Sequence, residues 1–317
     1  MFDRVLVPLD GSPLAECVLP HAAAFARAFN AQITLAHVLE QPSSSLALPK
    51  ADPLDWYLKK SEATLYLDNL KTRLEETGAS VQTLLLEGRV SEQIIELAHS
   101  SKTDLLILSG SGTLDAGRQA VSSNVLKILQ GVRTSILLVR TDQPAMPQIQ
   151  PITYQRVLVP LDGSQRAGSV LTLVTALAQA HHADLSLVHI VGRPEMARHM
   201  PLSQEDLELS DRFVARNQEE GRKYLEQVDA RLPVKAQTHL LVSDNVAATI
   251  QTLSDQDHTD LLVLSAHGYS GEAKWPYGGI TNRFITSGTT SLLIVQDLPQ
   301  SSSETVTTNV ETRQSVR

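Results

Sequence analysis

Short apolar runs alternate with amphipathic stretches along the whole chain. Residues 5–7 form a β-branched run closed by a proline and a Gly-Ser pair, which predicts a buried parallel strand ending in a turn. Residues 12–30 follow with helical spacing, and Pro20 inside that pattern is expected to kink the helix. Further strands are predicted at 31–38, 81–86, 104–108 and 135–140, and helices at 55–76, from a Ser91 cap onward, and at 121–130.

The nine residues 4–12, RVLVPLDGS, recur without change at 156–164, an offset of 152 residues (156 minus 4). Such an identity indicates duplication of one folding unit. The second copy predicts strands at 184–190, 235–241, 260–264 and 291–295, and helices at 164–180, 206–232, 246–253 and 280–286. Five strands alternating with four helices predict an α/β fold of two tandem, doubly wound, five-stranded parallel-sheet domains of Rossmann-like type.

The domain boundaries follow from length and composition. A chain of 317 residues fits two domains of ordinary size. We predict domains at 1–140 and 154–298, a proline-containing linker at 141–153, and a disordered tail at 299–317.

Composition disfavours several classes of protein. The net charge of −8 offers no basic surface for nucleic acid or an anionic membrane. Cys17 is the single cysteine, so no internal disulfide can form, and it falls on the apolar side of the first predicted helix, where a packed thiol is expected. Neither a signal-peptide pattern nor an apolar run of membrane-spanning length is present, so we expect a cytoplasmic protein.

Candidate chemistry begins with Asp10 and Asp162, which follow the first strand of each copy. Ligands of open α/β sheets bind outside the carboxyl ends of the strands, so both carboxylates are candidate site residues, although each could instead only cap its helix. His37 and His189 also match between the copies, at the ends of the second strands. Ligand contact is one interpretation of these histidines, and an ordinary polar strand end is the commoner one. The adjacent His181 and His182 are expected to be solvent-facing residues at a helix end.

The element order, the VLVPLDGS openings, and the DLLIL and DLLVL strands followed by small-residue loops resemble the universal stress protein family in both copies. Nucleotide-binding members of that family carry a loop of the form G-x-x-G, nine residues, G and Ser or Thr. Its glycines let the backbone approach phosphate oxygens, while N–H groups at a helix start hold the anion.

Neither copy has the intact loop. The pattern falls on Ser109, Gly112, Ser122 and Ser123 in the first copy, and on Ser265, Gly268, Gly278 and Gly279 in the second, which keeps more of the glycines. Asp115 and Glu272 bring negative charge towards a phosphate, and the bulky run 275–277 could close the second site or stack on a base. The second copy is therefore the favoured site.

The resemblance implies ATP or another adenine nucleotide as ligand, with Mg²⁺ only alongside ATP. The spacing of the residues themselves predicts no metal site and no catalytic residues. The resemblance also implies that the acidic loops contact ribose and adenine, that the second-strand ends offer backbone to adenine, and that the glycine loops hold phosphate. The implied binding residues are Pro8, Leu9, Asp10, Val38, Ser109, Gly110, Ser111, Gly112, Ser122 and Ser123 in the first copy, and Pro160, Leu161, Asp162, Ile190, Ser265, His267, Gly268, Gly278, Gly279 and Ile280 in the second.

The sequence thus predicts a stress-responsive, nucleotide-binding regulatory protein rather than an enzyme. One alternative is a slow ATP hydrolase or phosphotransfer protein, for which Asp10, Asp162, Asp115 and Glu272 are the ready carboxylates. Another is an interaction module that binds no nucleotide. The apolar last strands, SILLVR and SLLIVQ, would have unprotected edges, and the resemblance implies that they pair the two domains within one chain. The sequence leaves open whether whole chains pair further as a homodimer.

Overall fold

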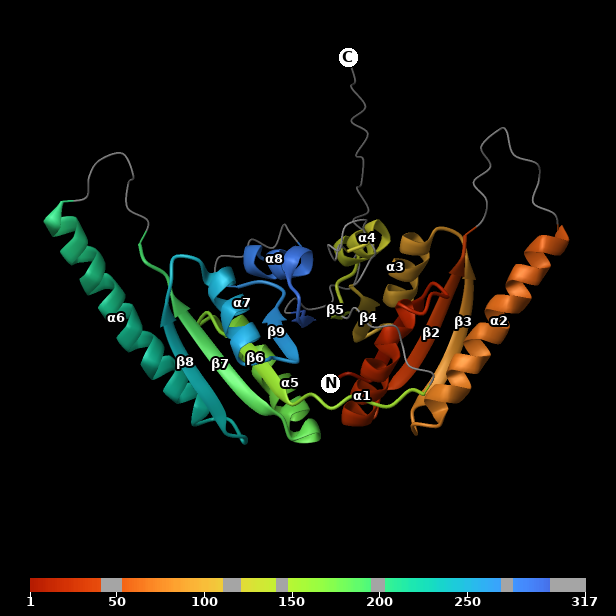
Figure 1. The fold of residues 1–317 in the computed structure, drawn as a ribbon, viewed down its shortest axis with the longest axis horizontal. Coiled ribbons are helices and arrows are strands. Elements are labelled where there is room, and N and C mark those ends of the chain that lie inside the picture. Colours follow the sequence, from red (N-terminus) through yellow and green to blue (C-terminus); the bar gives the residue numbers. More distant parts are fainter. Residues whose placement is uncertain (41–52, 111–120, 141–147, 195–202, 269–275, 297–317) are drawn as a thin grey trace, which may run out of the picture.

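A single sheet runs through both copies of the repeat. The structure is a computed structural model that describes residues 1–40, 53–110, 121–140, 148–194, 203–268 and 276–296. The strands lie in the order β3-β2-β1-β4-β5-β10-β9-β6-β7-β8 (Figure 1). Their bounds are β1 Arg4–Leu9, β2 Gln32–Leu39, β3 Ser80–Glu87, β4 Leu105–Ser109, β5 Ser135–Val139, β6 Arg156–Pro160, β7 Asp184–Val191, β8 Ala236–Val242, β9 Leu261–Ser265 and β10 Ser291–Val295. The predicted fold class is confirmed, since each copy contributes five parallel strands.

Helices cover both faces of the sheet. They are α1 Leu19–Phe29, α2 Pro53–Glu75, α3 Val90–Ser100, α4 Ser123–Gly131, α5 Gln165–His181, α6 Gln204–Asp229, α7 Val246–Gln256 and α8 Gly279–Ser287. The core that includes side chains of α1, α2, α5 and α6 lies on one face, and the core that includes α3, α4, α7 and α8 lies on the other. Successive strand residues serve opposite faces, as Val5 and Leu6 do, because side chains alternate along a strand.

The two copies meet where β5 and β10 pair antiparallel, with Leu137 opposite Leu293. Every residue of both strands is buried. The backbone N–H groups just past each strand are also used. Arg140 donates its N–H to the Ser291 hydroxyl and Gln296 donates to the Ser135 hydroxyl, both at 3.1 Å. The same contact is thus made twice across the seam between the copies.

A second contact between the copies is built on Tyr154, two residues before the start of β6. Its side chain is buried, and its hydroxyl shares a hydrogen bond of 2.7 Å with Nδ1 of His21 in α1. The ring meets Phe25 and His181 edge-on, with centroids 5.9 and 5.1 Å away. The expectation that His181 faces solvent is therefore wrong, because the aromatic ring of Tyr154 covers this helix end.

The described part of the predicted linker also packs. Ile149 and Ile152 contact the core, and the Ile152 N–H donates to the Pro20 carbonyl at 3.3 Å. Residues 141–147 and the predicted tail lie outside the described residues.

Two local predictions are wrong. Pro20 does not kink a helix interior, because a separate 3₁₀ turn at Ala15–Val18 comes first and Pro20 stands in the opening turn of α1. Its missing N–H costs nothing there. Ser91 does not cap α3, which begins one residue earlier with Arg89 at the cap position.

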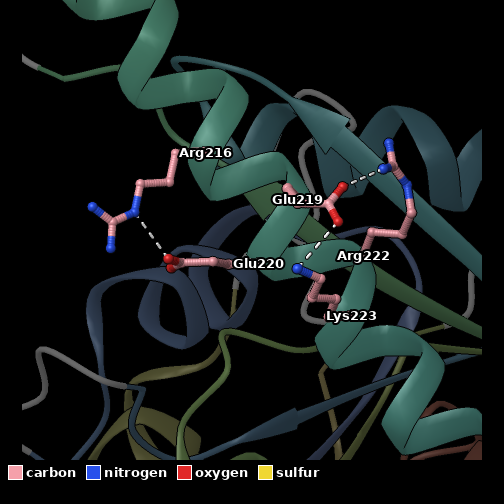
Figure 2. A network of polar contacts seen from close by, with 5 residues as sticks. All are labelled: Arg216, Glu219, Glu220, Arg222 and Lys223. Atoms are coloured by element: carbon pink, nitrogen blue, oxygen red, sulfur yellow. Dashed lines mark hydrogen bonds and ion pairs between the residues drawn. The ribbon is translucent and has the colours of Figure 1, made fainter.

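The exposed side of α6 carries ion pairs spaced three or four residues apart (Figure 2). Arg216 pairs with Glu220 at 3.0 Å, while Glu219 accepts from Arg222 at 2.6 Å and from Lys223 at 3.3 Å. Each of the five side chains is exposed over half of its surface or more. Each ion pair therefore adds at most a few tenths of a kcal/mol to the stability of the protein. Packing of the opposite face, through Leu225 and Val228, fixes the helix on the sheet.

The contact of His21 predicts a pH dependence of stability. Burial lowers the pKa of His21 from 6.5 to about 4, so the native state keeps this ring neutral while the unfolded chain takes up a proton below pH 6.5. The stability present above that pH is lost as the pH falls towards 4, by about 2 kcal/mol between pH 7 and pH 5. Denaturant unfolding at the two pH values measures the loss. In His21→Gln the loss should shrink, and an equal loss in both proteins would contradict the assignment.

Candidate functional site

A cavity of about 660 Å³ opens at the carboxyl ends of β6, β7 and β9, beside the start of α8. Its volume lies within the usual range for small-molecule sites. Every residue that the sequence predicted for the second copy lines it. The full lining is Pro160, Leu161, Asp162, Val188, Ile190, Val246, Ile250, Leu264, Ser265, His267, Gly268, Tyr277, Gly278, Gly279, Ile280 and Thr281.

Asp162 bends over the loop that follows β9. Its Oδ1 accepts the N–H of Ser164 at 2.9 Å, which closes a tight turn through Gly163 at a φ of +81°. A Cβ atom added to Gly268 would stand 2.5 Å from the Asp162 Oδ2. A side chain at position 268 would therefore have to displace this carboxylate. Asp10 makes the same turn in the first copy, accepting the N–H of Ser12 at 2.9 Å.

Hydrogen bonds tie this loop to the start of α8. The Gly278 N–H donates to the Ala266 carbonyl at 2.8 Å, and the Thr281 hydroxyl donates to the Ser265 carbonyl at 2.9 Å. The Ser265 hydroxyl donates to the His267 carbonyl at 2.7 Å. Gly278 stands at the N-cap of α8 and has no side chain to offer the N–H groups of the first turn. These donors and the positive end of the helix dipole face the cavity, where they suit an anion.

The first copy has a corresponding cavity of about 960 Å³. The start of α4, which lies beside this cavity, differs from the start of α8 in one chemical respect. Ser122 holds the N-cap of α4 at φ −62° and ψ 154°, close to the −67° and 164° of Gly278, and its hydroxyl accepts the Val125 N–H at 3.2 Å. One first-turn donor of α4 is therefore already satisfied by the chain itself.

Six of the residues predicted for the first copy line this cavity, namely Pro8, Leu9, Asp10, Val38, Ser109 and Ser122. Ser123 and Gly110 do not. Gly110 is buried, with its N–H on the Val139 carbonyl at 2.8 Å and its carbonyl on Nη1 of Arg140 at 2.7 Å. Ser111 and Gly112, like Asp115 and Glu272, lie outside the described residues.

Each of the two matching histidines forms a hydrogen bond with the residue just before the acidic side chain of its copy. Nδ1 of His37 lies 2.8 Å from the Leu9 carbonyl, and Nδ1 of His189 lies 2.8 Å from the Leu161 carbonyl. Because a carbonyl can only accept, the proton is on Nδ1 in both rings. Each histidine thus fixes the residue that precedes the acidic side chain, which explains why the pair recurs.

Some lining residues were missed by the sequence reasoning. Trp56 and Lys59 reach the first cavity from α2, and Val246 and Ile250 reach the second from α7. Their helices are distant in sequence from the loops, so no local motif marks them.

Cys17 is packed as predicted, 6% exposed, with its sulfur 3.7 Å from the Ser109 hydroxyl. Burial raises the pKa of this thiol. Among the residues that the structure describes, no three His, Cys, Asp or Glu side chains gather as a metal site would require. Within the same residues, no helix combines the length and apolar character needed to cross a membrane.

Comparison with known proteins identifies the family. The model of the universal stress protein family matches residues 1–140 and again 153–296. A universal stress protein of Methanocaldococcus jannaschii is 26% identical over 141 residues, covering 44% of this chain and 83% of the relative, and one of Thermus aquaticus is 30% identical over 145 residues, covering 44% and 100%.

Solved structures match the tandem arrangement. A universal stress protein from Archaeoglobus fulgidus covers 93% of this chain and 98% of its own at a TM-score of 0.66 and 15% identity, and one from Pseudomonas aeruginosa covers 93% of each at 0.67 and 15%. At such identities the likeness concerns the fold alone. Two matches of the family model, one to each copy, show that this chain belongs to the universal stress protein family.

Proposed function

We propose that this protein binds an adenine nucleotide in the cavity of its second copy and acts as a stress-responsive regulatory protein of the cytoplasm. The observation that carries the proposal is the start of α8. Its first turn has a glycine at the N-cap and opens into a cavity with an apolar floor. An uncapped helix start attracts phosphate, and an apolar floor accommodates a base.

The remaining lining groups fit the other parts of a nucleotide. The Asp162 carboxylate can only accept hydrogen bonds, so it suits the hydroxyl groups of a ribose. Its orientation is fixed by the Ser164 N–H. Ile190 and Leu161 offer apolar contact for the base at the strand ends. Mg²⁺ would enter only with ATP, as its phosphate counter-ion.

The first cavity supports weaker nucleotide binding. The Ser122 hydroxyl takes up a donor that a phosphate would use. Trp56 and Lys59 give this cavity an aromatic ring and a cation at its α2 side, so any ligand there would meet different chemistry.

The geometry favours binding over hydrolysis. Asp10 and Asp162 each accept an N–H from their own turn, so one oxygen of each carboxylate is already engaged as an acceptor. A general base for attack on a γ-phosphate must lie within reach of the attacking water.

The seam between β5 and β10 supports a further part of the proposal. It would give one chain the pairing of two domains that separate chains would otherwise have to form, so whole-chain dimers are not needed for either cavity.

Adenine nucleotides should stabilise the protein against heat. A ligand that binds only the folded state adds about 2.7 kcal/mol at roughly 100 times its Kd. We expect melting temperature to rise with ATP or AMP, and phosphate release to stay at the buffer level with and without Mg²⁺. Steady phosphate release would favour the hydrolase alternative. If ATP, AMP and a cyclic dinucleotide all left the melting temperature unchanged, the interaction-module alternative would be favoured instead.

Gly268→Val should strongly reduce this stabilisation. The new side chain displaces the Asp162 carboxylate, which lies where the Cβ would stand. We expect Kd to rise at least about tenfold, equivalent to about 1.4 kcal/mol. Gly192→Ala is the matched control, because a Cβ there meets nothing within 4 Å and Gly192 does not line the cavity. Unchanged affinity in Gly268→Val would reject the loop as part of the site.

Gly278→Ser transfers the cap of the first copy to the second. A Cβ at 278 meets its nearest neighbours at 3.6 Å, an ordinary contact, and the backbone angles match those of Ser122. The added hydroxyl should occupy the Thr281 N–H, stabilise the ligand-free protein by a few tenths of a kcal/mol, and weaken nucleotide binding about threefold or more. Titration calorimetry measures the affinity. Tighter binding would show that the helix start is not used in the way proposed.

A further inference from the structure

The first copy holds α8 at both of its ends. Just before the helix, the Tyr277 hydroxyl donates to the Leu129 carbonyl of α4 at 2.9 Å in a buried contact. Near the other end, Nη2 of Arg140 donates to the carbonyls of Ile285 and Phe284. The helix whose first turn faces the second cavity is therefore positioned by residues of the other copy.

In these two contacts the acceptor carbonyls occupy equivalent positions in the two copies, whereas the donor side chains differ. Leu129 and Ile285 occupy the same position in α4 and α8, 156 residues apart (285 minus 129), the offset that also separates Ser109 from Ser265 (265 minus 109). At that offset Tyr277 corresponds to Val121, whose side chain has no donor. The matching acceptors thus show a pseudo-symmetric pair of contacts. Among the residues that the structure describes, Val121 offers no counterpart of the Tyr277 hydroxyl at the start of α4.

Tyr277 links its hydrogen bond with Leu129 directly to the cavity. Tyr277 lines the cavity, and the next residue, Gly278, forms the N-cap of α8. The side chain is 9% exposed, and burial raises the pKa of its hydroxyl, which therefore stays protonated as a donor at neutral pH. Moving this ring would move the backbone whose N–H groups face the ligand.

Arg140 adds a link to the first loop. Its guanidinium donates through Nη1 to the Gly110 carbonyl at 2.7 Å and through Nη2 to the end of α8. The side chain is 8% exposed, so its hydrogen bonds are formed away from water, where they hold their geometry well.

We infer that Tyr277 and Arg140 are positioning residues through which the first copy completes the nucleotide cavity of the second. The inference rests on the proposed function for the ligand, and adds that the two copies form one binding unit. Removing the hold should loosen the start of α8 and weaken phosphate binding while the fold persists.

Tyr277→Phe in the full-length chain tests this, because it removes one hydroxyl and keeps the ring. We expect the Kd for ATP to rise about three- to tenfold, since the buried Leu129 carbonyl loses its partner and α8 is no longer fixed. Amide hydrogen exchange at residues 282–285, whose N–H groups are bonded within α8, should become faster in the ligand-free protein.

Tyr154→Phe is the matched control. It also removes a buried tyrosine hydroxyl that joins the copies, but at the amino end of β6, away from the cavity. Its ATP affinity and its exchange at α8 should match those of the unaltered chain. Arg140→Gln, which installs the residue found at position 296, should reproduce the effect of Tyr277→Phe if it folds.

The outcomes separate the two hypotheses. Equal affinity and equal α8 exchange in Tyr277→Phe and the unaltered chain would overturn the inference. An equal loss of affinity in Tyr154→Phe would also overturn it, because general destabilisation would then explain the effect. If the unaltered chain bound no nucleotide, the proposed function would fail, and exchange at α8 alone would decide whether the first copy holds the helix.

Discussion

Antiparallel pairing of β5 with β10 is the interaction on which the rest of this structure depends. Both strands are buried along their whole length, so neither could stand at a sheet edge without exposing an apolar surface and a row of unpaired backbone groups. Pairing them removes both edges at once and continues each core across the seam. It also brings α4 and α8 together, since each of these helices leads into its copy's last strand.

The two cavities illustrate how a small chemical difference separates sites of one design. Both cavities have the same turn at the acidic residue and the same histidine contact at the end of the first strand. His37 and His189 each lie 2.8 Å from the carbonyl that they contact. The helix starts have nearly the same backbone angles, yet Ser122 satisfies a donor that Gly278 leaves to the cavity. Under the proposed function, this single hydroxyl group would make the first cavity the weaker site for an anion.

The sequence predicted what is periodic or repeated. The duplication was predicted from the identical residues 4–12 and 156–164. The predicted strand at 291–295 has the same bounds as β10. Helix starts were predicted less well, because Pro20 satisfies a helix pattern equally as an interior or an opening residue.

The pairing of the last strands was predicted, but the side-chain contacts between the copies could not be. Tyr277 and Leu129 lie 148 residues apart in sequence, and nothing local in either segment indicates that they meet. Trp56 and Lys59 likewise reach the first cavity only because α2 packs against its own sheet. Such residues are defined by tertiary geometry, which a linear pattern does not contain.

Joining the copies in one chain has an evolutionary consequence. In a dimer of identical subunits, any substitution appears in both sites, so the two cannot specialise separately. Here the partner is tethered at a fixed effective concentration, and dilution cannot exchange it for another. One copy is therefore free to diverge from the other, and the serine at the start of α4 and the glycine at the start of α8 are one such difference between the two copies.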